Sequence, residues 1–179
     1  MFDLLPPDII QRARRVKLLI LDVDGVLTTG QLFMSSTGEI IKPFNTLDGH
    51  GIKMLHQTGV QTAIITARSD PAVAARAEQL GITHYFKGAH NKKIAYEQLR
   101  EQANVSELEC AFVGDDVIDL PVLIRCGLPI AVQNAHEFVK QHTVYTTEKF
   151  GGMGAVREVT DLIMYSQNTL QIALEEYIK

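Results

Sequence analysis

Apolar runs of strand length recur along the chain and alternate with segments whose apolar residues return at helical spacing. This alternation is typical of an α/β fold, in which a parallel sheet is covered by helices. Parallel strands are usually covered on both faces, so we expect each strand to be buried. The expected strands are residues 17–22, 61–66, 84–86, 109–114, 128–131 and 143–145.

Helices are expected in the segments between the strands, at residues 49–58, 71–80, 92–103, 118–126 and 135–140. Pro71 stands at the start of one of them, where its missing N–H removes no hydrogen bond. After Phe150 a glycine turn, "GGMG", leads into a long amphipathic helix or a helix with a tail, over residues 153–179. No internal repeat or linker interrupts the series, so we expect one domain over residues 1–179.

One segment departs from the alternation. "GQLFMSSTGEIIKPF", residues 30–44, has two short apolar runs on either side of the turn-forming sequence "SSTG". This pattern predicts a β-hairpin inserted after the first strand. A hairpin alone is marginal and needs a partner surface for its apolar side chains, so we expect a homo-oligomer. The apolar residues concerned are Leu32, Phe33, Ile40, Ile41 and Phe44.

Charge and composition restrict the possible partners. The formal net charge is -4 and basic residues form no run longer than a pair, which argues against nucleic-acid binding. No apolar run approaches the roughly 18 residues that a membrane span needs. Cys110 and Cys126 match neither a metal-binding pair nor a disulfide framework, which indicates reduced thiols. We therefore expect a cytoplasmic protein whose partners are small molecules or proteins.

Acidic residues follow two of the expected strands. Asp22 and Asp24 follow the first strand, whereas Asp115 and Asp116 follow the fourth, with Asp119 in the next turn. Because ligands bind outside the carboxyl ends of parallel strands, these carboxylates are expected to converge on one site. Like charges that close repel each other, and a divalent cation would offset the repulsion. An all-oxygen ligand set favours Mg²⁺.

The same site has the residues needed for phosphoryl transfer. Asp22 is placed to attack phosphorus and form an aspartyl-phosphate, while Asp24 exchanges protons with the leaving group and the water. Gly25 permits a sharp turn, so that backbone N–H groups approach the phosphoryl oxygens. Thr66 can donate a hydrogen bond, and the ammonium of Lys92 offsets phosphoryl charge.

This set of residues resembles the haloacid dehalogenase superfamily of phosphatases, whose four motifs appear here in the family order. The motifs are "DVDGV", "IITAR", Lys92 within "HNKKIAYEQL", and "GDDVIDLP". Ala67 is a departure, because the family usually has glycine there. The resemblance implies a Rossmann-like parallel sheet sandwiched by helices, with a small hairpin in place of a cap domain. It also implies Mg²⁺ bound by the Asp22 carboxylate, the Asp24 backbone carbonyl and Asp115.

Within that superfamily, residues 14–165 are similar to phosphatases of 3-deoxy-D-manno-octulosonate 8-phosphate (Kdo8P). The similarity rests on "DGVLTTG", the hairpin, "FNTLDGHGIKML" and "GGMGAVREVTDLI". It implies hydrolysis of Kdo8P to Kdo and phosphate in lipopolysaccharide precursor biosynthesis. It also implies a homotetramer in which neighbouring subunits cover each other's active sites. The expected substrate-binding residues are Gly25, Asp48, Thr66, Arg68, Lys92 and Arg157.

Several residues have a second interpretation. Asp116 supports the metal or caps a helix, and we expect Asp119 to support the ligands without binding the metal itself. Lys92 and Lys93 are both compatible with an exposed helix face, and the family pattern favours Lys92 for the site. Arg157 is compatible with an ordinary surface position.

Three other functions fit these residues and their order less well. A receiver domain has its acidic pair at the first strand, whereas here the pair "DD" comes after the fourth. A phosphomutase needs a large cap, and the segment from Val26 to Leu47 is too short for one. A non-catalytic oligomerisation module is also compatible with the fold, but it would not need Asp22, Asp24, Lys92 and Asp115. A sialic-acid-type 9-phosphate is the nearest alternative substrate.

Overall fold

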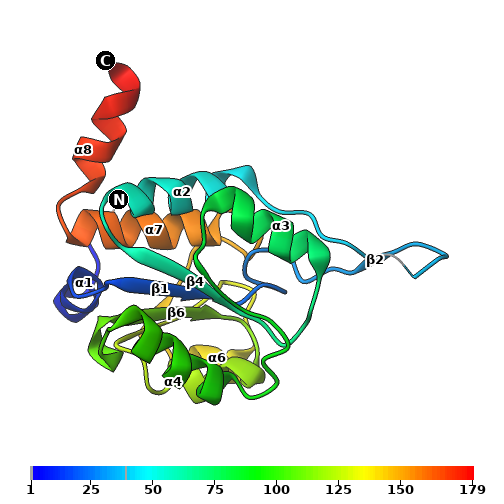
Figure 1. Ribbon diagram of the computed structural model, residues 1–179. Coiled ribbons are helices and arrows are strands. Elements are labelled where there is room, and N and C mark those ends of the chain that lie inside the picture. Colours follow the sequence, from blue (N-terminus) through cyan, green and yellow to red (C-terminus); the bar gives the residue numbers. More distant parts are fainter. Residues whose placement is uncertain (1, 39) are drawn as a thin grey trace.

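A six-stranded parallel sheet forms the centre of the protein in the computed structural model, which describes residues 2–38 and 40–179 (Figure 1). The strand order is β5-β4-β1-β6-β7-β8, so β1 and β6 lie side by side in the middle of the sheet. The strands are β1 (Leu18–Leu21), β4 (Gln61–Ile65), β5 (His84–Phe86), β6 (Cys110–Gly114), β7 (Leu128–Ala131) and β8 (Tyr145–Thr146). The predicted α/β fold with a parallel sheet is confirmed.

Burial differs between the centre and the edges of the sheet. Every residue of β1, β6 and β7 is buried, which explains their continuous apolar sequences. In contrast, β5 and β8 are only partly buried, because each pairs with a neighbour on one side alone. The expectation that every strand is buried was therefore wrong for the two edge strands.

Helices cover both faces of the sheet (Figure 1). On one face α2 and α7 pack against each other with α3 beside them, while α4 and α6 lie on the other. Side chains of Asn45, Asp70 and Asn91 cap α2, α3 and α4 by accepting hydrogen bonds from backbone N–H groups. The α-helices are α1 (Pro7–Arg14), α2 (Thr46–Gln57), α3 (Pro71–Leu80), α4 (Lys92–Ala103), α5 (Leu120–Leu123), α6 (Glu137–Lys140), α7 (Ala155–Ser166) and α8 (Leu170–Glu175).

Three details differ from the sequence expectation. Helix α1 was not expected, although its Ile9 and Ala13 are buried. Residues 118–126 form a 3₁₀ turn, η2 (Val117–Asp119), and the short α5 rather than one helix. The C-terminal segment is two helices, because Asn168 has a positive φ of 59° between them. Helix α8 extends away from the sheet layers (Figure 1).

The inserted hairpin is present and lies outside the main sheet. It pairs β2 (Phe33–Met34) with β3 (Ile40–Ile41) in antiparallel register, and it projects from the body (Figure 1). Phe33 is 51% exposed and Ile41 is 65% exposed. Residue 39 of the expected hairpin lies outside the described residues. Over the described chain, none of the helices has the length and apolar character that crossing a membrane requires.

Candidate active site

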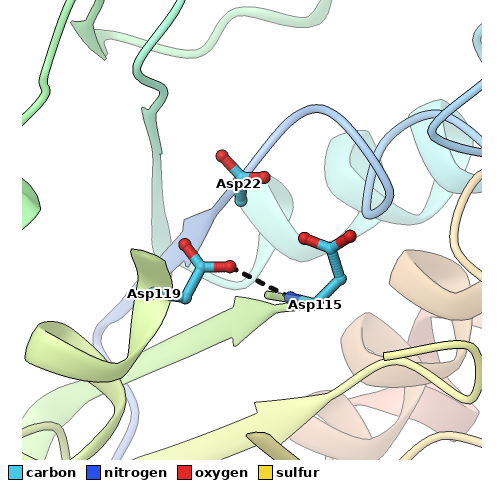
Figure 2. Close-up of side chains that lie close together, drawn as sticks. All are labelled: Asp22, Asp115 and Asp119. Atoms are coloured by element: carbon cyan, nitrogen blue, oxygen red, sulfur yellow. Dashed lines mark hydrogen bonds between the residues drawn. The ribbon is translucent and has the colours of Figure 1, made fainter. Parts of the chain in front are cut away.

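Three aspartates meet at the carboxyl ends of the two central strands. Asp22 follows β1, Asp115 follows β6, and Asp119 ends η2 (Figure 2). One carboxylate oxygen from each residue lies within 4.8 Å of the others. Since β1 and β6 are parallel neighbours, residues placed directly after them are brought together by the sheet register.

Lys92 enters this group from the first turn of α4. Its Nζ lies 2.6 Å from Asp22 Oδ1 and 2.6 Å from Asp119 Oδ1, and the residue is 2% exposed. The adjacent Lys93 points elsewhere, with its Nζ 3.7 Å from Glu97 Oε1 on the exposed side of the helix. The structure thus brings Lys92, and not Lys93, to the aspartates.

Asp119 uses both carboxylate oxygens to organise its neighbours. Oδ2 accepts from the backbone N–H of Asp115 at 3.0 Å (Figure 2). Oδ2 also accepts from the N–H of Asp116 at 3.5 Å, while Oδ1 accepts from Lys92. A side chain at Gly114 would obstruct this arrangement, because a Cβ there would lie 2.5 Å from Asp119 Oδ2. Asp116 caps η2, since its Oδ1 accepts from the N–H of Val117 at 2.7 Å.

The turn after β1 packs tightly against Asp115. Gly25 has a φ of +93°, and a Cβ at this position would lie 2.0 Å from Asp115 Oδ2. The later glycine segment supports the same turn: a Cβ at Gly151 would lie 1.6 Å from the carbonyl oxygen of Gly25. The N–H of Gly152 also donates to the carbonyl of Val26 at 2.8 Å. The "GGMG" motif therefore closes against the "DVDG" motif, although the two are far apart in sequence.

The electrostatic balance of the group is unfavourable without a further cation. Burial raises the pKa of Asp22 to about 6, with the charge of Asp119 adding to the rise and Lys92 opposing it. Burial also raises the pKa of Asp115 to about 8, and the neighbouring carboxylates Asp22 and Asp119 add to it. Burial acts to lower the pKa of Lys92, but the charges of Asp22 and Asp119 outweigh it and raise that pKa.

Three carboxylates thus share one ammonium, and oxygen atoms are the ligands that a hard divalent cation prefers. A doubly charged ion would balance the remaining negative charge. The residues present therefore fit Mg²⁺.

Asp24 lies beside this group with two cations on its carboxylate. Its Oδ1 accepts from Lys42 Nζ, and its Oδ2 lies 3.6 Å from Arg68 Nε. Thr66 is buried directly after β4, where its Oγ1 accepts from the N–H of Arg68 at 3.3 Å. Sequence reasoning did not identify Lys42. The available signal was a lysine directly after the apolar hairpin strand β3.

Asp48 on α2 and Arg157 on α7 are joined by one hydrogen bond between the two helices. Asp48 is 1% exposed, and its Oδ1 accepts from the backbone N–H of Arg157 at 2.8 Å. The Arg157 Nε donates to both carboxylate oxygens of Asp161, at 2.8 and 2.9 Å. Burial raises the pKa of Asp48. The substrate contacts expected of Asp48 and Arg157 stay predictions.

Comparison with known proteins agrees with this geometry. Residues 33–127 match the family model described as haloacid dehalogenase-like hydrolase. The 3-deoxy-D-manno-octulosonate 8-phosphate phosphatase KdsC of Escherichia coli K12 is 44% identical over 166 residues, which cover 93% of this chain and 88% of that protein.

Two solved structures with the same enzyme name have closely similar folds. The enzyme from Yersinia pestis superposes with a TM-score of 0.92 at 42% identity, covering 93% of this chain and 90% of that one. The enzyme from Moraxella catarrhalis, solved with a magnesium ion, a phosphate ion and Kdo, gives 0.93 at 39% identity, covering 95% and 98%. The chain therefore belongs to the haloacid dehalogenase-like hydrolases and, within them, to the family of 3-deoxy-D-manno-octulosonate 8-phosphate phosphatases.

Proposed function

We propose that this enzyme hydrolyses 3-deoxy-D-manno-octulosonate 8-phosphate to Kdo and phosphate, with Mg²⁺ as cofactor. The observation that carries the proposal is the buried Asp22–Lys92–Asp119 chain of hydrogen bonds beside Asp115. The name of the Escherichia coli relative and the magnesium, phosphate and Kdo of the Moraxella catarrhalis structure support the substrate and the cofactor. A product of this kind belongs to lipopolysaccharide precursor biosynthesis.

In the first step, a carboxylate oxygen of Asp22 attacks phosphorus as the bond from phosphorus to the sugar oxygen breaks. Asp24 donates a proton to that departing oxygen. In the second step, Asp24 takes a proton from a water molecule that attacks the aspartyl-phosphate, and phosphate leaves with Asp22 restored. Lys92 keeps Asp22 oriented and offsets negative charge on the phosphoryl group.

We assign the metal to the carboxylates of Asp22 and Asp115 and to the backbone carbonyl of Asp24. When bound, Mg²⁺ would offset the charge of the phosphoryl oxygens and of the aspartates. Asp119 is left to a supporting role, because its two oxygens already accept hydrogen bonds from Lys92 and the Asp115 backbone.

The burial of the remaining expected site residues suggests which part of the substrate each one contacts. Thr66 is buried and suits the phosphoryl group, as do the N–H groups of the Gly25 turn. Arg68 has half of its side chain exposed and suits the sugar acid at the rim. For Arg157 we propose a substrate contact on the basis of its motif alone. Its guanidinium bonds Asp161 in this structure.

We further propose that the active enzyme is a cytoplasmic homotetramer. The hairpin leaves Phe33, Met34 and Ile41 exposed on a small two-stranded element, which is marginal without a partner surface. Association with twofold symmetry would bury these residues without open-ended growth. Buried, unpaired Cys110 and Cys126 agree with a reducing compartment.

The substrate proposal is tested by measuring phosphate release from a panel of sugar phosphates with Mg²⁺ present. We expect the largest kcat/KM for Kdo8P. A larger value for a sialic-acid-type 9-phosphate would change the substrate while retaining the chemistry. No release from any ester would leave the protein as a non-catalytic module.

A further inference from the structure

Lys42 is a buried lysine on an otherwise exposed hairpin. It directly follows β3, where Ile41 is 65% exposed, yet the Lys42 side chain is only 2% exposed. Lysine is rarely buried unless it is paired, because its ammonium loses hydration. A lysine buried to this extent therefore needs acidic partners, and two lie beside it.

Those partners join three segments that are distant in sequence. The Lys42 Nζ donates to Asp24 Oδ1 and lies 3.8 Å from Asp70 Oδ2. Asp24 belongs to the turn after β1, whereas Asp70 caps α3 through its other oxygen, which accepts from the Ala72 N–H at 2.9 Å. Lys42 thus connects the hairpin to the active-site turn and to a fixed helix end.

The two oxygens of Asp24 have different neighbours. Oδ1 is held by the buried Lys42, whereas Oδ2 lies 3.6 Å from Arg68, whose side chain is 50% exposed. One oxygen is therefore anchored in the interior and the other is on the open side of the site. A carboxylate that exchanges protons must keep one oxygen within hydrogen-bond reach of the departing atom.

We propose that Lys42 is a positioning residue for Asp24. By holding Oδ1, its ammonium fixes the orientation in which Oδ2 faces the leaving group, and Asp70 keeps the ammonium in place. The hairpin is then part of the proton-transfer apparatus in addition to any covering role. This inference rests on the proposed phosphatase function.

The consequence is a dependence on the leaving group. Phenyl phosphate and p-nitrophenyl phosphate are similar in size and lack the sugar, but phenolate needs protonation more than nitrophenolate does. Because kcat/KM reports steps up to departure of the leaving group, we expect Lys42→Met to lower kcat/KM for phenyl phosphate by about 10- to 100-fold. The value for p-nitrophenyl phosphate should change by no more than about threefold.

The matched control is Lys93→Met, because Lys93 is an exposed lysine paired only with Glu97 among the residues described. Lys93→Met should leave kcat/KM for both aryl esters unchanged. Lys42→Gln keeps a hydrogen-bond donor without the charge, and should retain more activity on phenyl phosphate than Lys42→Met does. If circular dichroism shows that Lys42→Met does not fold, Lys42→Gln takes its place in the comparison of the two esters.

A double variant separates positioning from direct substrate contact. In the Asp24→Asn background, Lys42→Met should cause no further loss on phenyl phosphate, since both changes act through one group. Equal losses on the two aryl esters, or a full additional loss in the double variant, would overturn the proposal. A wild-type protein that hydrolyses no ester would instead overturn the phosphatase function, and this inference with it.

Discussion

Gly25 and Asp115 are in direct contact across the active site, so close that a Cβ on Gly25 would lie 2.0 Å from Asp115 Oδ2. The contact joins the turn after β1 to the end of β6, and it involves the carboxylate that we assign to the metal. A side chain at this position would therefore have to displace the Asp115 carboxylate, and the φ of +93° also favours glycine.

Gly25→Ala tests this contact. We expect turnover to fall by more than about 100-fold and Mg²⁺ affinity to weaken, because the added methyl displaces Asp115. Gly59→Ala is the matched control, since Gly59 has a similar φ of +89° but no atom within 4 Å of its Cβ position. Both variants carry about 1–2 kcal/mol of backbone strain. If they have equal activity, the Gly25 contact is not important for catalysis.

Asp22→Asn and Asp24→Asn are expected to impair different parts of the reaction: nucleophilic attack and proton transfer. Asp22→Asn should abolish turnover and covalent phosphorylation with the fold intact, because an amide oxygen is a poor nucleophile. Asp24→Asn should lower the rate by about 10²- to 10⁴-fold, with the larger loss on a poor leaving group. Rapid-quench labelling by a radioactive phosphate ester distinguishes the two variants. Near-normal phosphate release by Asp22→Asn would rule out the nucleophile.

Lys92→Met and Lys93→Met compare a buried lysine with its exposed neighbour. Removing the Lys92 ammonium leaves Asp22 and Asp119 buried without it, so we expect loss of activity and about 3–5 kcal/mol lower stability in the metal-free protein. Lys93→Met should change stability by no more than about 0.5 kcal/mol, since its pair is exposed. Chemical denaturation measures both. Similar effects of the two changes would contradict the placement of Lys92.

The raised pKa values predict a pH-dependent response to Mg²⁺. The pKa of Asp22 is about 6 and that of Asp115 about 8, both above the ordinary value of 3.8. From about pH 3.8 up to these raised values, the folded protein retains protons that the unfolded chain has lost. The free energy of unfolding of the metal-free protein should therefore fall as the pH rises through this range. Metal binding needs deprotonated carboxylates, so the rise in Tm on adding Mg²⁺ should be larger near about pH 8 than near about pH 5.

Scanning fluorimetry with EDTA or Mg²⁺ measures this difference. Asp115→Asn is the control, and it should be more stable than wild type in EDTA at high pH, because it removes a charge from the crowded group. An Mg²⁺ shift independent of pH would contradict the assignment of the metal to these carboxylates.

Phe33→Asp tests the proposed tetramer. Placing a charge on the exposed hairpin should dissociate the particle and raise KM for Kdo8P more than for p-nitrophenyl phosphate, since the chemical groups lie within one chain. Analytical ultracentrifugation at assay concentration gives the assembly state. A fully active wild-type monomer would exclude the tetramer.

Features that depend on local pattern could be predicted from the sequence. The strands His84–Phe86 and Leu128–Ala131 and the helices Pro71–Leu80 and Lys92–Ala103 lie where the alternation of apolar residues placed them. The meeting of Asp22 with Asp115 also followed, because parallel strands end at one edge of the sheet.

Features that depend on tertiary packing could not be predicted from the sequence. The contact of Lys42 with Asp24 requires the hairpin to fold back onto the turn, and no local periodicity encodes that. Asp48 bonds the Arg157 backbone across two packed helices, although its motif resembles a substrate-binding segment. The partial exposure of β8 arises from its edge position in the strand order.

The most direct test of the account is the release of phosphate from Kdo8P by wild type and by Asp22→Asn, with Mg²⁺ and with EDTA. We predict stoichiometric conversion to Kdo and phosphate by wild type with Mg²⁺ alone, with no release by Asp22→Asn. Release that persists in EDTA or in the variant, or its absence from wild type with Mg²⁺, would contradict the account.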